Sequence, residues 1–220
     1  METQSMSTET RALDLLPPKV LEAYGTNGDR LNFNDVYNNN HINVQVPQYV
    51  GMTTGQTLRA RWTSGRYVYE TETLTVGQPA PQIFKIPRLE VIDSIGSLVT
   101  VNYSVRTVSG LPLQISKALT LRVDPQSFDL VEPRLSEDRK TVTVKFLNMT
   151  TGFTVKVRWH GIVVRDTESK PILNDSSIPF SIPASWGSEN VGKTVLINYS
   201  VYRSGSNDNL MFSKLLRLAL

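Results

Sequence analysis

The side chains best suited to acid–base or metal chemistry are two histidines, His41 and His160, in a chain of 220 residues. Neither has partners at the spacing of a catalytic triad, and neither belongs to a metal-binding pattern. The chain has no cysteine, which excludes disulfides, thiolate metal sites and cysteine nucleophiles. Segment 51–55, Gly-Met-Thr-Thr-Gly, lacks the ending of a phosphate-binding loop, and segment 206–209 has too few carboxylates for calcium. The sequence therefore predicts no enzyme, no cofactor and no metal.

Basic residues alternate with apolar ones along two segments, and this pattern points to binding. Arg59 and Arg61 alternate with the apolar residues of segment 58–62, and Lys156 and Arg158 do so in segment 155–159. In a strand, such alternation sends the basic side chains to the outer face. Arginine donates paired hydrogen bonds to anionic groups, so these faces are candidates for binding acidic glycans, lipopolysaccharide phosphates or an acidic protein.

An ordinary solvated face is the alternative interpretation, and we favour it. Glu70 and Glu72 fall on the strand expected next to Arg59 and Arg61 and can pair with them across the sheet. Exposed pairs of this kind contribute only some tenths of a kcal/mol to stability.

Four further residues are candidate ligand contacts. Arg66 and Tyr67 form a basic and aromatic edge, and His160 directly follows a tryptophan. Trp186, if exposed, can anchor a sugar or a protein by stacking. A shift of one residue in the alignment places Trp186 in the core, and we favour the core.

The elements that must position these residues occur twice. Segment 51–62 returns as segment 148–159, so that Met149 follows Met52 by 97 positions, and segments 84–87 and 99–105 return 96 positions later. A period of about one hundred residues is too long for a solenoid unit and matches a small β-sandwich domain. The chain is therefore a tandem duplication of one domain.

Apolar residues in both copies follow the two-residue period of half-buried strands. Segment 88–96 differs, because its apolar residues have helical spacing and it ends in glycine, so we expect a short helix there. We expect a flexible tail at 1–16, one domain at 17–124 and a second at 125–220. The Asn-rich segment 32–43 has few apolar residues, so we expect an irregular loop there. The predicted fold is all-β, with two tandem antiparallel β-sandwiches without disulfides.

A tryptophan ending one strand and a Tyr-x-Val about forty residues later resemble the tryptophan and Tyr-x-Cys of immunoglobulin-like sandwiches, with valine in place of the cysteine. More narrowly, Gly-Met-x-x-Gly-x-Thr-x-x-x-x-Trp, Phe-x-Ile-Pro and Gly-x-x-Val-x-Val-x-Tyr-x-Val resemble the immunoglobulin-like repeats of large repetitive, adhesin-like proteins of pseudomonads and related bacteria. The resemblance covers 17–220 and implies arrays of binding or spacer modules, secreted or displayed on a surface. It transfers no catalytic residue.

Composition limits the remaining choices. A net charge of +3 is too small for a dedicated nucleic-acid binder, and the chain has no apolar run long enough to span a membrane. Residues 1–13 lack the apolar region of a cleavable signal. We expect a monomer that is secreted or surface-displayed by a route without such a signal, or cytoplasmic.

The expected function is a non-enzymatic adhesion or spacer module that recognises a glycan or protein on a cell surface. The alternative is a secreted effector or toxin that uses these domains to bind a receptor. Because the repeated motifs are core and turn positions, a specific activity must reside where the copies differ. Those places are the Asn-rich segment 32–43, His160, Trp186 and the hairpin 204–209, which is one residue longer than its counterpart in the first copy.

Overall fold

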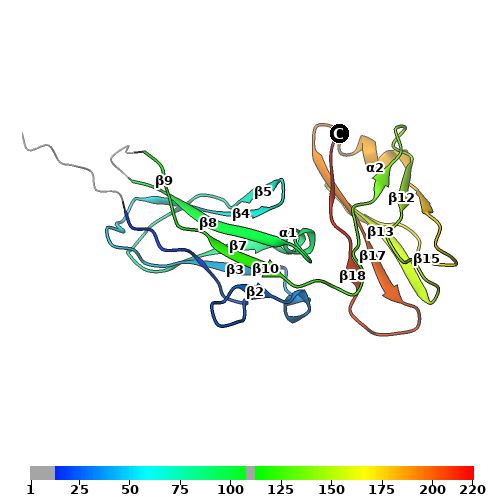
Figure 1. Cartoon of the computed structure of the whole chain (residues 1–220). Coiled ribbons are helices and arrows are strands. Elements are labelled where there is room, and N and C mark those ends of the chain that lie inside the picture. Colours follow the sequence, from blue (N-terminus) through cyan, green and yellow to red (C-terminus); the bar gives the residue numbers. More distant parts are fainter. Residues whose placement is uncertain (1–12, 108–111) are drawn as a thin grey trace, which may run out of the picture.

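The chain folds into two β-sandwiches that follow one another along the sequence (Figure 1). The computed structural model describes residues 13–107 and 112–220. The buried apolar residues form two clusters, one between Leu15 and Val123 and the other between Leu130 and Val201. The predicted all-β fold without disulfides is confirmed. The predicted domain boundary at 124/125 stays a prediction, and it falls in the interval between the two cores.

The first sandwich faces a three-stranded sheet against a seven-stranded sheet. The smaller sheet has the order β1 (Lys19–Val20), β3 (His41–Val46), β7 (Gln82–Pro87). The larger has the order β2 (Arg30–Leu31), β10 (Leu119–Val123), β8 (Leu98–Arg106), β4 (Thr57–Ser64), β5 (Tyr67–Glu70), with β6 (Leu74–Thr75) beside β4 and β9 (Gln114–Ile115) beside β8. All described pairings are antiparallel except that of β2 with β10.

The second sandwich repeats this plan without a counterpart of β2. Its smaller sheet has the order β11 (Arg134–Leu135), β12 (Thr141–Val144), β16 (Ile178–Ser181). The other has the order β14 (Val164–Asp166), β13 (Phe153–His160), β17 (Thr194–Arg203), β18 (Met211–Phe212), with β15 (Lys170–Pro171) beside β13 and β19 (Leu216–Ala219) beside β17. The duplication read from the sequence is therefore a duplication of topology.

Alternating burial explains why these segments form strands. In β4 the residues Leu58, Ala60 and Trp62 are at most 1% exposed, while the arginines between them face outward. Val105 and Val201, which stand where the resemblance would place a cysteine, are fully buried. Apolar packing therefore joins the two sheets of each sandwich.

One expected element is confirmed and two expectations need correction. The helix predicted at 88–96 is α1 (Arg88–Asp93), and the chain leaves it through Gly96 at φ +75°. The Asn-rich segment 32–43 is not simply irregular, because it contains a 3₁₀ helix, η1 (Phe33–Val36), and the start of β3. The predicted tail is packed where it is described: Leu15 is 3% exposed and its carbonyl accepts a hydrogen bond from the Lys117 amide. Residues 1–12 of that tail lie outside the described residues.

Candidate functional site

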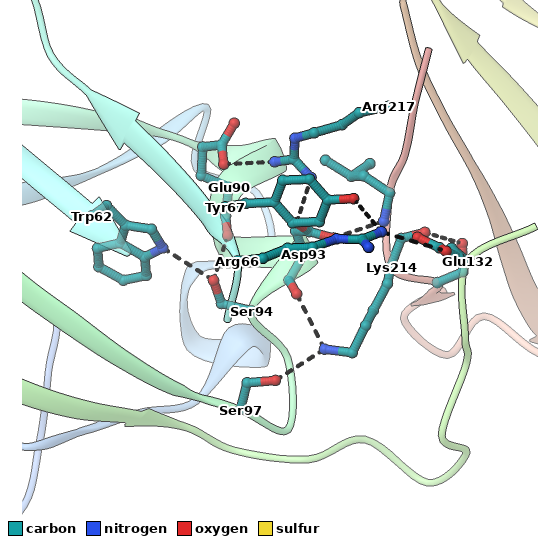
Figure 2. Close-up of polar contacts among 12 residues, drawn as sticks. Trp62, Arg66, Tyr67, Glu90, Asp93, Ser94, Ser97, Glu132, Lys214 and Arg217 are labelled. Atoms are coloured by element: carbon teal, nitrogen blue, oxygen red, sulfur yellow. Dashed lines mark hydrogen bonds and ion pairs between the residues drawn. The ribbon is translucent and has the colours of Figure 1, made fainter. Parts of the chain in front are cut away.

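A buried polar network joins the end of α1 to the second domain (Figure 2). Asp93 is 6% exposed, and its carboxylate accepts hydrogen bonds from the Leu215 amide at 2.7 Å and from Arg217 Nη1 at 2.5 Å. The second amino group of Arg217 donates to Glu90 Oε2 at 2.9 Å. Lys214 Nζ donates to the carbonyls of Asp93 and Ile95 and to Ser97 Oγ. We call Glu90, Asp93, Lys214 and Arg217 the joint.

The predicted edge formed by Arg66 and Tyr67 lies beside the joint. The Arg217 guanidinium stacks over the Tyr67 ring at 4.2 Å from its centroid. Arg66 donates to the Tyr67 hydroxyl at 2.8 Å and lies 4.0 Å from Glu132, on the segment that enters the second domain. These two side chains are therefore engaged in contacts between the domains.

Aromatic side chains cover another part of the boundary. Phe212 of β18 lies 5.8 Å from Phe33 and 6.1 Å from Tyr37, ring centroid to ring centroid. The Arg88 guanidinium lies 4.9–5.3 Å from the centroids of these three rings. A guanidinium held over aromatic faces is attracted by their quadrupoles. Arg88 thus links the two domains through rings and not through a carboxylate.

The two segments that the repeats do not share meet here. Asn209, in the longer hairpin of the second domain, donates to Asn34 Oδ1 at 3.3 Å. The Leu210 amide donates to the Tyr37 hydroxyl at 3.1 Å. The Asn-rich segment and the hairpin 204–209 are thus both used to build the boundary.

A cavity of about 390 Å³, which we call the boundary cleft, opens between the domains beside Arg88. The first domain supplies Arg88, Tyr37 and Asn40 among its walls, and β13 of the second domain supplies Lys156, Arg158 and His160. None of the described residues that line the cleft is acidic. The structure therefore gathers three of the predicted contact residues opposite one cation, Arg88, and one side-chain amide, Asn40, of the first domain.

The charge of the cleft is only partly balanced. Asp166 pairs with Lys156 at 3.0 Å and with Arg158 at 2.6 Å, so one carboxylate serves two cations. Chiefly through the Arg158 hydrogen bonds, the pKa of Asp166 falls to about 2, and Asp166 is ionised at neutral pH. Within the described residues no carboxylate lies within ion-pair distance of Arg88. The cleft thus carries excess positive charge.

His160 forms a neutral part of the wall. Burial lowers the pKa of its imidazole, and the hydrogen bond with Asn198 opposes that shift without reversing it. The imidazole Nε2 lies 3.0 Å from Asn198 Oδ1, and Asn198 is 2% exposed. His160 therefore contributes a polar, uncharged surface at pH 7.

The corresponding face of the first domain has the same pairing of two cations with one carboxylate, but it is uncovered. Arg59 and Arg61 both pair with Glu70, at 2.9 Å and 2.5 Å, as the interpretation of a solvated face expects for Glu70. Glu72 forms no ion pair within the described ranges. The hollow on this face, between the two arginines and Ile115, has a volume of only about 10 Å³. The cleft of the second domain is larger because the first domain covers it.

Trp186 lies inside the second domain. It is 8% exposed in α2 (Ala184–Ser188), and its ring packs edge-on against Trp159 with 6.1 Å between the centroids. A side chain in this position does not offer a face for stacking on a ligand, so we leave Trp186 out of the proposed site.

Two residues of the boundary, Arg88 and Asp93, were not singled out from the sequence, whereas Tyr37 and Asn40 fall in the Asn-rich segment 32–43 that was. Asymmetry between the copies is the signal that could have found Arg88, because Ala184 stands at its place in the second copy. Contacts between the domains, such as that of Asp93 with Arg217, cannot be predicted from the spacing of apolar residues within either copy.

Within residues 13–107 and 112–220, no three His, Asp or Glu side chains are grouped so as to hold a metal ion. None of the helices formed by the described residues has the length and hydrophobicity needed to cross a lipid bilayer.

The fold and the cleft define a tandem pair of β-sandwich domains with a ligand-sized cavity at their boundary. No protein-family model matches the sequence, and no curated protein matches it. The structure is similar to the tetra-tandem repeat in the extending region of a large adhesion protein (12% identity, TM-score 0.38, 94% of this chain and 49% of that chain). It is also similar to the BSP domain of a biofilm-associated protein (13% identity, TM-score 0.29, 92% and 29%). A third similar structure is that of the FN1-FN3 domains of chicken CNTN1 (9% identity, TM-score 0.25, 94% and 65%). This chain thus spans less than two thirds of each, and such identities and TM-scores establish no shared function.

Proposed function

We propose that the chain is a non-enzymatic adhesion module in which two β-sandwiches keep one fixed orientation and present the boundary cleft to a glycan or protein on a cell surface. The observation that carries this proposal is the joint. Its central carboxylate, Asp93, belongs to the first domain, yet two of its hydrogen-bond donors belong to the second.

The burial of Asp93 makes separation of the domains costly. Removing one partner of a buried ion pair typically costs about 3–5 kcal/mol, because it leaves a desolvated charge unpaired. Swinging the second domain away would remove Arg217 and the Leu215 amide from Asp93 together. The same motion would expose Phe212 to solvent and remove its ring from the group of three rings that contact Arg88. A rigid pair of domains suits a module that carries load or holds a binding site at a distance.

The fixed orientation can be tested by measuring a distance between the domains. The chain has no cysteine, so spin labels can be attached at Gln78→Cys and Ser176→Cys, which are exposed positions in the first and second domains. Pulsed electron paramagnetic resonance should give one narrow distance distribution. The added changes Lys214→Gln and Arg217→Gln should broaden it, whereas Lys85→Gln, an exposed lysine away from the boundary, should not. A broad distribution in the labelled parent would overturn the fixed orientation.

Adhesion itself can be tested with the labelled chain on intact cells. We expect saturable binding to at least one cell type, weakened when Lys156→Gln alters the cleft. Saturable binding to none of a broad panel would leave a spacer and refute the adhesion role.

A further inference from the structure

We propose that the boundary cleft binds an acidic sugar unit, that is, a saccharide carrying a carboxylate or sulfate group, between Arg88 of the first domain and Lys156 of the second. This inference rests on the proposed function, because it names the ligand class of the same cleft. It assigns the specificity of the module to the boundary between the domains and not to either sheet face.

The first support is the unbalanced charge of the cleft. Lys156 and Arg158 share Asp166, and Arg88 has no acidic partner among the described residues. The half-buried guanidinium of Arg88 lies over aromatic rings, yet its N–H groups can still donate hydrogen bonds to an oxyanion. A carboxylate or sulfate group that enters the cleft would neutralise part of this excess positive charge.

The second support is the neutral lining. Neither the Ser200 hydroxyl nor the Asn40 amide forms a side-chain hydrogen bond within the described residues, and both line the cleft beside the His160–Asn198 pair. Phe212 and Leu89 supply apolar surface. A sugar ring has hydroxyl groups around its edge and an apolar C–H face, so it matches a wall with both free polar groups and an aromatic ring.

The third support is the size of the cavity. Its volume of about 390 Å³ lies within the range of about 300–1,000 Å³ that is usual for small-ligand sites. The space suits one or two sugar units and does not suit a folded partner.

The duplication provides a control within the molecule. Arg59, Ser104 and Ile115 hold in the first domain the places that Lys156, Ser200 and Phe212 hold in the second. Nearly the same chemistry is present there, but the hollow is only about 10 Å³ because no domain covers it. If the basic charge on the sheet were sufficient, the sheet faces of both domains would bind the acidic sugar. If the covered cleft is needed, only the face of the second domain will bind it.

The test uses the full chain and defined probes. Binding of digalacturonic acid, its dimethyl ester, a sulfated lactose and a tetraglutamate peptide is followed by amide chemical shifts in NMR titrations. We expect at least one of the two anionic sugars to bind and to shift the amides of His160, Asn198 and Ser200. The dimethyl ester, which keeps the shape of digalacturonic acid and removes its charge, should bind at least tenfold more weakly.

The variants separate the cleft from the matched face. Lys156→Gln and Arg88→Gln should each weaken binding about fivefold or more, and Arg59→Gln should leave it within about twofold. Asp166→Asn should tighten binding, because it releases two cations from their shared carboxylate. The interdomain distance is measured in each variant, so that a loss of orientation is distinguished from a loss of ligand contact.

Four results would overturn the inference: binding of neither anionic sugar, equal binding of the ester, an equal loss in Arg59→Gln, or tighter binding of the peptide at the same amides. Each of them leaves the fixed orientation of the domains standing, because that property has its own measurement.

Discussion

Equivalent residues in the two domains have different hydrogen-bond partners, as the two buried tryptophans Trp62 and Trp159 show. Trp62 Nε1 donates to Ser94 Oγ at 3.0 Å, whereas Trp159 Nε1 has no partner within the described residues. Asn190 stands at the place of Ser94, but its side chain is already bonded to the Trp186 carbonyl and the Ile162 amide. The second domain thus folds with the Trp159 N–H buried and unpaired, which is unfavourable because the donor has lost its contact with water.

Ser94→Ala should destabilise the first domain, because it leaves the buried Trp62 N–H without an acceptor. The expected loss is about 1–2 kcal/mol in the free energy of unfolding. Urea unfolding followed by fluorescence measures it, with Ser185→Ala, an exposed serine of α2, as the control. A loss no larger than that of the control would contradict the role of this hydrogen bond.

Asp166 gives the second domain a pH-dependent contribution to stability. Its pKa is depressed to about 2 in the folded chain, chiefly by hydrogen bonds from Arg158. Because the folded pKa lies below the unfolded one, the stabilisation is present above about pH 4 and is lost as the pH falls toward 2. Solvent screening of this partly exposed group limits the effect to about 1 kcal/mol. Asp166→Asn should be less stable than the parent at pH 7 and nearly equal to it at pH 2, and Glu168→Gln should match the parent throughout.

At the scale of elements, the sequence was sufficient for the repeated parts. Alternation in segments 58–62 and 155–159 predicts β4 and β13 with the correct inward faces, and the glycine after segment 88–95 predicts the end of α1. These features follow from local periods of two or about 3.6 residues. The packing of η1 against β18 could not be predicted, because it depends on how one domain lies on the next. The same holds for the cleft, whose walls come from segments about 120 residues apart, such as Arg88 and Phe212.

The two acidic residues of α1 should respond oppositely to neutralisation. Burial raises the pKa of Glu90 despite the nearby Arg217, so the ionised form of Glu90 is disfavoured by folding. Glu90→Gln should therefore leave the melting temperature unchanged or raise it at pH 7. Asp93→Asn should lower it, because an amide cannot accept in full from both Arg217 and the Leu215 amide. Differential scanning calorimetry compares the variants, and a larger loss in Glu90→Gln than in Asp93→Asn would be inconsistent with this account.

At the scale of the whole molecule, each copy carries an addition that the other lacks, and the two additions meet at the boundary. Tyr37 comes from the Asn-rich segment, and Leu210 follows the longer hairpin. The duplicated scaffold alone would give two domains joined by a short linker. The Asn-rich segment and the hairpin 204–209 add an interface between the domains, with a cavity beside it.

Such an interface should make the two domains unfold as one unit. In urea, the far-ultraviolet circular dichroism of the whole chain and the fluorescence of a Trp62→Phe variant, which retains only Trp159 and Trp186 in the second domain, should give coincident transitions. Arg217→Gln leaves Asp93 buried without its cation, which should weaken the coupling by about 3 kcal/mol and separate the two transitions. Lys85→Gln, which changes charge equally and touches no joint residue, should keep them coincident. Two separate transitions in the parent chain would mean that the joint contributes too little to hold the domains together, and the fixed orientation would then have to come from the linker alone.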